Sequence, residues 1–148
     1  MVHKAGAFVI RRTAASGRPA ELLLFAHADF PQVPLQIPGG SIEPGEAPDA
    51  AALRELHEEA GIVPLPLIRE IGVSETPSHL EADAIVKRHC FLFDGGGLPD
   101  RWIHSVTGAG DDKGLRFEYR WHTVGSELRL AGSQGYFLNP GAIPELYA

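Results

Sequence analysis

The segment PGGSIEPGEAPDAAALRELHEEAGI, residues 38–62, joins a glycine-rich lead-in to a run of strong helix formers. Pro48 suits the first turn of a helix, where a missing N–H is no loss, and Asp49 lies near the positive end of the helix dipole. Gly61 is a natural terminator, because glycine readily adopts the left-handed conformation that ends many helices. The pattern predicts a helix over residues 48–60, the strongest helix signal in the chain.

The predicted helix gathers its charged residues on one side. At about 100° per residue, one arc of about 140° holds Arg54, Glu58, Glu55 and Glu59, and the opposite side carries alanine and leucine. An ordinary solvated acidic face is one interpretation. Glu55 and Glu59 argue against it, because like charges four residues apart cost a few tenths of a kcal/mol on an exposed helix. Converging carboxylates suit a hard cation such as Mg²⁺, and the glycines let a ligand approach the backbone near a helix N-terminus.

Apolar or alternating runs on both sides of this helix predict strands at residues 6–10, 22–26, 35–37, 65–73, 84–94 and 114–124. The clearest is the last, in which Phe117, Tyr119 and Trp121 share one face and Glu118 the other. Residues 125–133 and 139–148 predict one or two short helices. Because no repeat or linker divides the sequence, we expect a single α/β or α+β domain over residues 1–148, with helices packed on a mixed sheet.

Composition narrows the possible partners and location. The formal net charge of −6 disfavours an extended nucleic acid, since such binding needs clustered Lys and Arg. The one cysteine, Cys90, forms no internal disulfide. The apolar run near the start is too short for a signal peptide, and no stretch approaches the ~20 apolar residues of a membrane span. We therefore expect a cytoplasmic protein without a membrane partner.

The spacing within residues 40–62 resembles the box of the Nudix hydrolase family, G-x5-E-x7-R-E-U-x-E-E-x-G-U, where U is a bulky aliphatic residue. The matching residues are Gly40, Glu46, Arg54, Glu55, Leu56, Glu58, Glu59, Gly61 and Ile62. Every fixed position agrees, although the box covers only part of the chain. The resemblance implies an α/β/α sandwich around a mixed β-sheet, with one central loop-helix motif that carries the catalytic residues.

The resemblance also implies a metal site. Glu58 and Glu59 match the main ligands of Mg²⁺ or Mn²⁺, and Glu55 matches either a further ligand or the general base that activates water. Arg54 would orient these glutamates through charge-assisted hydrogen bonds. The backbone carbonyl of Gly39 matches the main-chain ligand of the family.

Three further residues have implied roles around the metal. Glu46 would brace the loop without touching the ion, and Gly40 and Gly61 would shape the two ends of the motif. Many family members complete the site with an acidic residue from a later loop or strand. Asp111, Asp112 and Glu118 are candidates here, and Glu118 is chosen as a metal ligand because it lies opposite the aromatic face of its strand; an ordinary solvent-facing residue is the alternative.

The implied chemistry is hydrolysis of a phosphoanhydride bond in a nucleoside diphosphate linked to another moiety, such as a nucleotide, ADP-ribose or a nucleotide sugar. The expected partner is that small molecule, and the expected assembly is a monomer or homodimer. The alternatives are a catalytically silent module that senses a nucleotide, a purely structural domain, and a metal-dependent isomerase on the same fold. The complete set Arg54, Glu55, Glu58 and Glu59 favours the hydrolase, since a sensor has no need of it.

Overall fold

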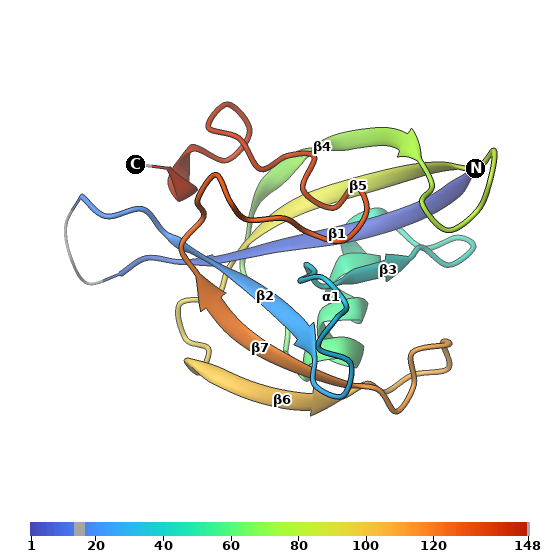
Figure 1. Ribbon diagram of the computed structural model, residues 1–148, viewed down its shortest axis with the longest axis horizontal. Coiled ribbons are helices and arrows are strands. Elements are labelled where there is room, and N and C mark those ends of the chain that lie inside the picture. The colour runs from blue at the N-terminus through green and yellow to red at the C-terminus, as the bar shows by residue number, and fades with distance from the viewer. Residues whose placement is uncertain (14–16, 148) are drawn as a thin grey trace.

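The computed structural model describes residues 1–13 and 17–147, and a mixed sheet forms its centre (Figure 1). The strands lie in the order β4-β5-β1-β2-β7-β6, and β3 pairs with β1. Only β1 and β5 run parallel, while the other neighbouring pairs are antiparallel. The strands are β1 (Val2–Arg11), β2 (Glu21–His27), β3 (Gly39–Ser41), β4 (Leu67–Pro77), β5 (Ile85–Asp94), β6 (Arg101–Ser105) and β7 (Arg116–His122).

Strands β1 and β2 pair only at one end and then diverge. Their register joins Ile10 to Leu22 and Arg11 to Glu21. Beyond that point, residues 36–41 lie between the two strands: Gln36 forms a bridge with Phe25 of β2, and β3 pairs with β1. This arrangement places the predicted glycine-rich loop within the sheet, close to its centre.

The predicted helix is confirmed as α1 (Pro48–Ala60). Gly61 ends it in the left-handed conformation, with φ 72°. The Gly61 N–H donates to the His57 carbonyl at 3.0 Å, and the Ile62 N–H donates to the Leu56 carbonyl at 3.2 Å. A residue with a Cβ would be strained at this angle, which explains the glycine. The sequence signals for the start and the end of this helix were therefore sufficient to define it.

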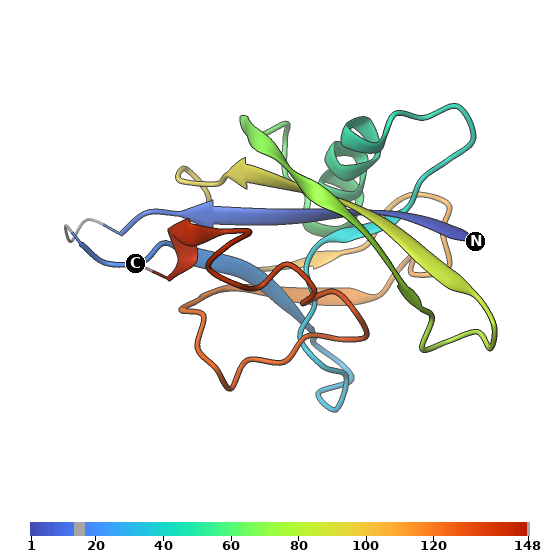
Figure 2. The same cartoon turned by 90° about the horizontal axis from the view of Figure 1, so that it is seen from above.

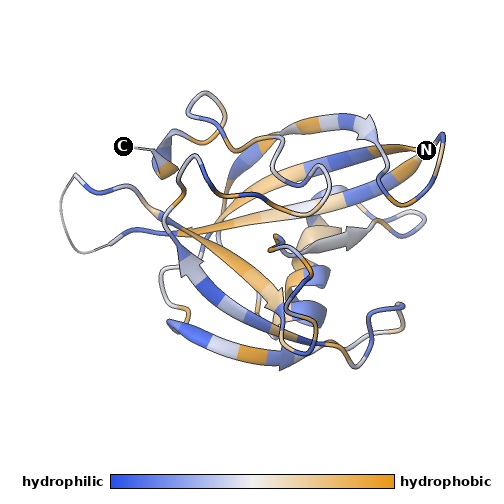
Figure 3. Cartoon of the chain, in the orientation of Figure 1, coloured by the Kyte–Doolittle hydropathy of each residue, from blue (hydrophilic) through white to orange (hydrophobic). Residues whose placement is uncertain are grey.

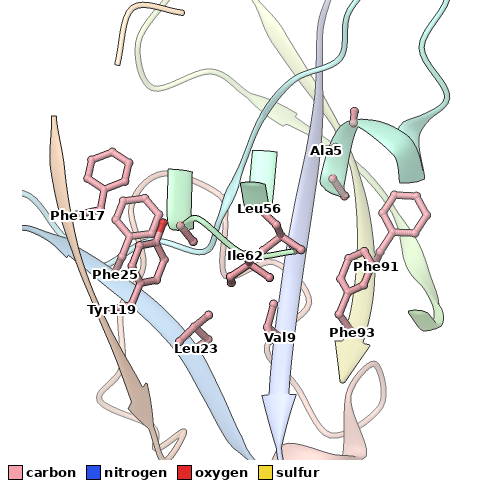
Figure 4. Close-up of a cluster of buried hydrophobic side chains, with 14 of the residues drawn as sticks. Ala5, Val9, Leu23, Phe25, Leu56, Ile62, Phe91, Phe93, Phe117 and Tyr119 are labelled. Carbon is pink, nitrogen blue, oxygen red and sulfur yellow. The ribbon is translucent and has the colours of Figure 1, made fainter. Parts of the chain in front are cut away.

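Helix α1 and the C-terminal segment lie on opposite faces of the sheet (Figure 2). An apolar layer lies beneath each of them. The α1 layer includes Leu56 and Ile62, which lie between a group of aromatic residues on β2 and β7 and a second group on β5 (Figure 4). The other layer includes Leu22, Leu92, Ile143 and Leu146. Apolar residues are concentrated in the central strands, whereas the outer strands alternate with polar residues (Figure 3).

The second face departs from the expected sandwich. Residues 124–147 cover it as irregular chain, with one 3₁₀ turn, η1 (Pro144–Leu146), in place of the predicted short helices. The mixed sheet and the α+β class are confirmed. The prediction also missed β6, a five-residue strand whose order depends on pairing with β7 rather than on its own pattern. Among the described residues, no helix has both the length and the apolar character needed to cross a membrane.

Candidate functional site

Helix α1 presents its glutamates at the boundary between the apolar layer and a cavity. Glu59 is buried together with Ala52, Leu56 and Ala60, and only 4% of its surface is exposed. Glu55 and Glu58 flank it with partly covered side chains. The helix therefore places one carboxylate inside the protein and two beside it, which differs from a solvated acidic face.

Arg54 connects these carboxylates to the loop before the helix. Its Nε and Nη2 donate to the two oxygens of Glu46, at 2.9 and 3.0 Å. Its Nη1 donates to Glu55 and Glu58, at 3.0 and 3.2 Å, and Nη2 also reaches the Ser41 carbonyl at 2.9 Å. A guanidinium suits this task because its fork can hold two carboxylate oxygens at once.

Glu46 holds the turn that precedes the helix. Besides its paired bonds with Arg54, it accepts the backbone N–H of Glu43 at 3.0 Å. The hydrogen bond from Arg54 lowers the pKa of the Glu46 carboxyl below its ordinary value. Glu46 therefore stays ionised and ties the loop to α1, as a residue that braces the loop would.

The buried Glu59 accepts the Gly39 N–H at 2.7 Å through Oε1. Burial raises the pKa of the Glu59 carboxyl well above its ordinary value, the Gly39 hydrogen bond opposes this, and the nearby Glu55, Asp112 and Glu58 raise it further. Burial likewise raises the pKa of Glu55. Excess negative charge in a dry site is unfavourable unless a cation compensates for it. It is the N–H of Gly39 that the structure places against Glu59; the proposed ligand role of its carbonyl remains a prediction.

Two glycines make room for the other carboxylates. A Cβ at Gly40 would lie 2.6 Å from the carboxyl carbon of Glu55, and one at Gly108 would lie 2.6 Å from that of Glu58. Gly108 also has φ 94°, and the preceding Thr107 N–H donates to the Glu58 carbonyl at 2.9 Å. The loop after β6 therefore packs closely against the end of α1. The role of Gly108 could not be predicted from the sequence, because only the fold brings this loop to the helix.

The structure places Glu118 away from this cluster, which corrects its selection as a metal ligand. It receives hydrogen bonds from Arg101 at 2.7 Å and Arg120 at 3.2 Å. The alternation of β7 turns Phe117 and Tyr119 toward α1, and the charges of Glu59 and Glu55 contribute to the raised pKa of Tyr119. The aromatic face, rather than the opposite one, faces the site.

Asp112 is the later acidic residue that comes near the glutamates. It contributes to the raised pKa of Glu59 and lines the same cavity, which has a volume of about 530 Å³. Gly39, Gly40 and Glu59 line it too. Asp111, the third candidate, is exposed and is not part of the lining.

The residues present fit a hard divalent cation. Glu59 faces the cavity, and its Oε2 accepts no hydrogen bond from the described part of the chain. Carboxylate oxygens are the donors that Mg²⁺ and Mn²⁺ prefer. Within residues 1–13 and 17–147, however, no three His, Cys, Asp or Glu side chains are already grouped as a metal site. Arg54 now binds Glu55 and Glu58, so these side chains would have to turn toward an ion.

The sequence model of the NUDIX domain family matches residues 2–136. This chain belongs to the Nudix family. An RNA pyrophosphohydrolase of Cereibacter sphaeroides is 32% identical over 120 residues, which cover 75% of this chain and 72% of that protein. Two mouse diphosphoinositol polyphosphate phosphohydrolases, 3-alpha and 3-beta, are 47% identical over 92 residues. That match covers 62% of this Nudix chain and 52% of each mouse protein, so it spans about half their length.

Solved structures agree on the fold. The Nudix domain of Shewanella oneidensis NrtR, solved with ADP-ribose, has a TM-score of 0.64 at 16% identity, covering 90% of this chain and 81% of that one. A Caenorhabditis elegans Ap4A hydrolase binary complex has a TM-score of 0.59 at 22% identity, covering 82% and 79%. At these identities the likeness establishes the Nudix fold and leaves the substrate open.

Proposed function

We propose that this Nudix protein is a metal-dependent hydrolase of a phosphoanhydride bond in a nucleoside diphosphate linked to another moiety. The observation that carries the proposal is the buried Glu59, surrounded by Glu55, Glu58 and Asp112 and open to a cavity. A buried, ionised carboxylate is energetically unfavourable without a counter-charge, whereas a divalent cation beside it would stabilise the negative charge. The matched relatives whose names describe pyrophosphate or diphosphoinositol hydrolysis support the same reaction class.

Glu59, Glu58 and Glu55 are the residues that would hold Mg²⁺ or Mn²⁺, with Asp112 in place of Glu118 as the acidic residue from a later loop. The bound ion would neutralise the diphosphate charge and lower the pKa of a water. Glu55, released from Arg54, is the candidate to accept the proton of that water, because its own raised pKa makes it a better base than an ordinary glutamate. The hydrogen bonds between Arg54 and Glu46 would hold the loop and the helix in fixed relative positions during the reaction.

The test is a panel of nucleoside triphosphates, ADP-ribose, nucleotide sugars and dinucleoside polyphosphates, assayed with Mg²⁺ or Mn²⁺. We expect Glu59→Gln and Glu58→Gln to lose about 100-fold or more in kcat/KM and to bind Mn²⁺ more weakly by electron paramagnetic resonance. Circular dichroism checks that each variant folds.

Glu127→Gln is the matched control, because Glu127 is exposed and forms no ion pair within the described residues. It should retain the wild-type rate and Mn²⁺ affinity. Full activity in the Glu58 and Glu59 variants would contradict the metal assignment. Tight nucleotide binding without turnover of any substrate would favour the sensor instead.

A further inference from the structure

A polar row crosses the sheet on the face opposite α1. Arg88 of β5 is in register with Ser74 of β4 and with Lys4 of β1. Directly paired residues point to the same face of a sheet, so the three side chains lie side by side. Their neighbours Cys90 and Leu92 on β5 belong to the apolar layer under the C-terminal segment. A charged row within such a layer requires an explanation.

Arg88 has too few partners for its position. Its Nη1 donates to the Ser133 hydroxyl at 2.9 Å, and that hydroxyl also accepts the hydroxyl of Thr76 at 2.7 Å. No carboxylate in the described residues forms an ion pair with Arg88, and burial lowers the pKa of its guanidinium. A guanidinium has five N–H donors, so most of them remain available.

Ser74, the neighbour of Arg88 in this row, is also unpaired within the described residues, although it does not line the cavity. It is 2% exposed, and its hydroxyl has no hydrogen-bond partner among the described residues. Native proteins rarely leave a buried hydroxyl unpaired, and a half-buried arginine is seldom left without an anion. A purely structural role, in which Arg88 only anchors Ser133, would explain one N–H and leave the other donors of Arg88 unexplained.

The cavity joins this row to the glutamates. Its lining contains Glu59 and Asp112 and also Arg88, Lys4, Ser133 and Gln134. Exposed Glu81 also lines it, without an ion pair to Arg88. Strands lie about 4.8 Å apart, so the backbone of Arg88 is about 10 Å from β3, across β1. A single nucleotide-sized molecule can span that distance.

We propose that Arg88 binds a phosphate group that the substrate carries in addition to the diphosphate that is cleaved. The inference rests on the proposed function and narrows its substrate class to diphosphates with a further phosphomonoester. The Arg88 guanidinium and the carboxylates that would hold a metal ion give the cavity two separate sites for negative charge. The bidentate geometry of arginine suits a phosphate. Lys4 has another partner, because its Nζ donates to the Ser41 hydroxyl at 3.0 Å and its charge acts on Glu55.

The test compares substrates that differ by one phosphate: coenzyme A with dephospho-coenzyme A, and 2′-phospho-ADP-ribose with ADP-ribose. We expect wild type to prefer the phosphorylated member of at least one pair by about 10-fold or more in kcat/KM, the range of a lost charged hydrogen bond. Arg88→Gln should remove the preference while leaving the rate on the unphosphorylated member within about 2-fold. Arg88→Lys should restore part of it.

Lys87→Gln is the control, because Lys87 is the neighbour of Arg88 on β5 and faces the other side of the sheet. It should keep the wild-type preference. An equal loss on both members of each pair would mean that Arg88 binds their common part, and would overturn the proposal. The absence of any preference in wild type would overturn it too.

A binding measurement separates this inference from the proposed function. Calorimetry measures the affinities for adenosine 2′,5′-bisphosphate, adenosine 3′,5′-bisphosphate and 5′-AMP. None of these ligands has a phosphoanhydride bond, so binding is measured without hydrolysis. We expect a bisphosphate to bind at least about 10-fold more tightly than AMP to wild type, and no tighter than AMP to Arg88→Gln. If no substrate is hydrolysed but this difference is found, the hydrolase proposal fails and the phosphate site stands. If all three bind alike, the phosphate site fails.

Discussion

Two segments of similar length cover the two faces of the sheet, and they are built differently. Residues 38–62 form a loop and a capped helix, in which Arg54 links the loop to the helix through short-range hydrogen bonds. Residues 124–147 have little regular structure and depend on contacts with the sheet, such as the buried Ile143 and Leu146. The first segment carries the candidate chemistry and the second closes the cavity. Regular structure is therefore concentrated where atoms must be positioned most closely.

The largest expected effect is on the stability that the C-terminal segment supplies. Ile143 is completely buried, so Ile143→Ala should lower the free energy of unfolding by about 3 kcal/mol. Urea denaturation measures this, and Mn²⁺ affinity of the folded protein should stay unchanged. Tyr136→Ala, at an exposed position of the same segment, should change stability by about 0.5 kcal/mol or less. Equal losses in both variants would show that the segment is not held by its buried residues.

The next effect tests the close packing of the loop against the helix. Gly40→Ala would place a methyl group 2.6 Å from the Glu55 carboxyl carbon, and Glu55 would have to move. We expect kcat/KM to fall by about 50-fold, within the range for a displaced catalytic group, with a weaker Mn²⁺ titration.

Gly110→Ala is the control for this change, since its Cβ would meet no atom within 4 Å. It should behave as wild type. A fully active Gly40→Ala enzyme would show that the carboxylate tolerates displacement, and that the loop only needs to be flexible.

The smallest effect concerns the ion pair that fastens the C-terminal turn. Arg69 of β4 donates to both oxygens of Glu145 and to the Ala142 carbonyl. Arg69→Met should lower stability by at most about 1 kcal/mol, because Arg69 is 37% exposed and water screens the pair.

The pH dependence of this loss has a definite sign. Hydrogen bonds from Arg69 lower the pKa of Glu145 below its ordinary 4.5. The pair therefore stabilises the protein above about pH 4.5, and its contribution disappears as the pH falls through the lowered pKa. Unfolding curves of wild type and Arg69→Met should differ at neutral pH and converge in acid. A difference that widens in acid would contradict this account.

Local signals predicted the first segment well. Pro48 and Gly61 mark the ends of a helix by their own backbone chemistry. Because the predicted helix forms as α1, the sequence positions of its charged residues were enough to place them close together: Arg54, Glu55, Glu58 and Glu59. The features that the sequence did not predict depend on contacts between distant parts of the chain. Strand β6 is ordered by β7, Gly108 is needed only because its loop meets Glu58, and Glu118 was assigned to the wrong face. Asp112 and Glu118 are six residues apart, and only the fold determines which one approaches Glu59.

The divergence of β1 and β2 has a consequence for how such a protein can change. Because the sheet opens there, the cavity takes its lining from both faces, with Glu59 contributed by one and Ser133 by the other. Under the proposed function, substitutions in the C-terminal segment would alter which molecule is bound, while the carboxylates on α1 would stay in place. The opening would thus separate the residues that select the substrate from those that cleave its bond, so that the two could vary independently.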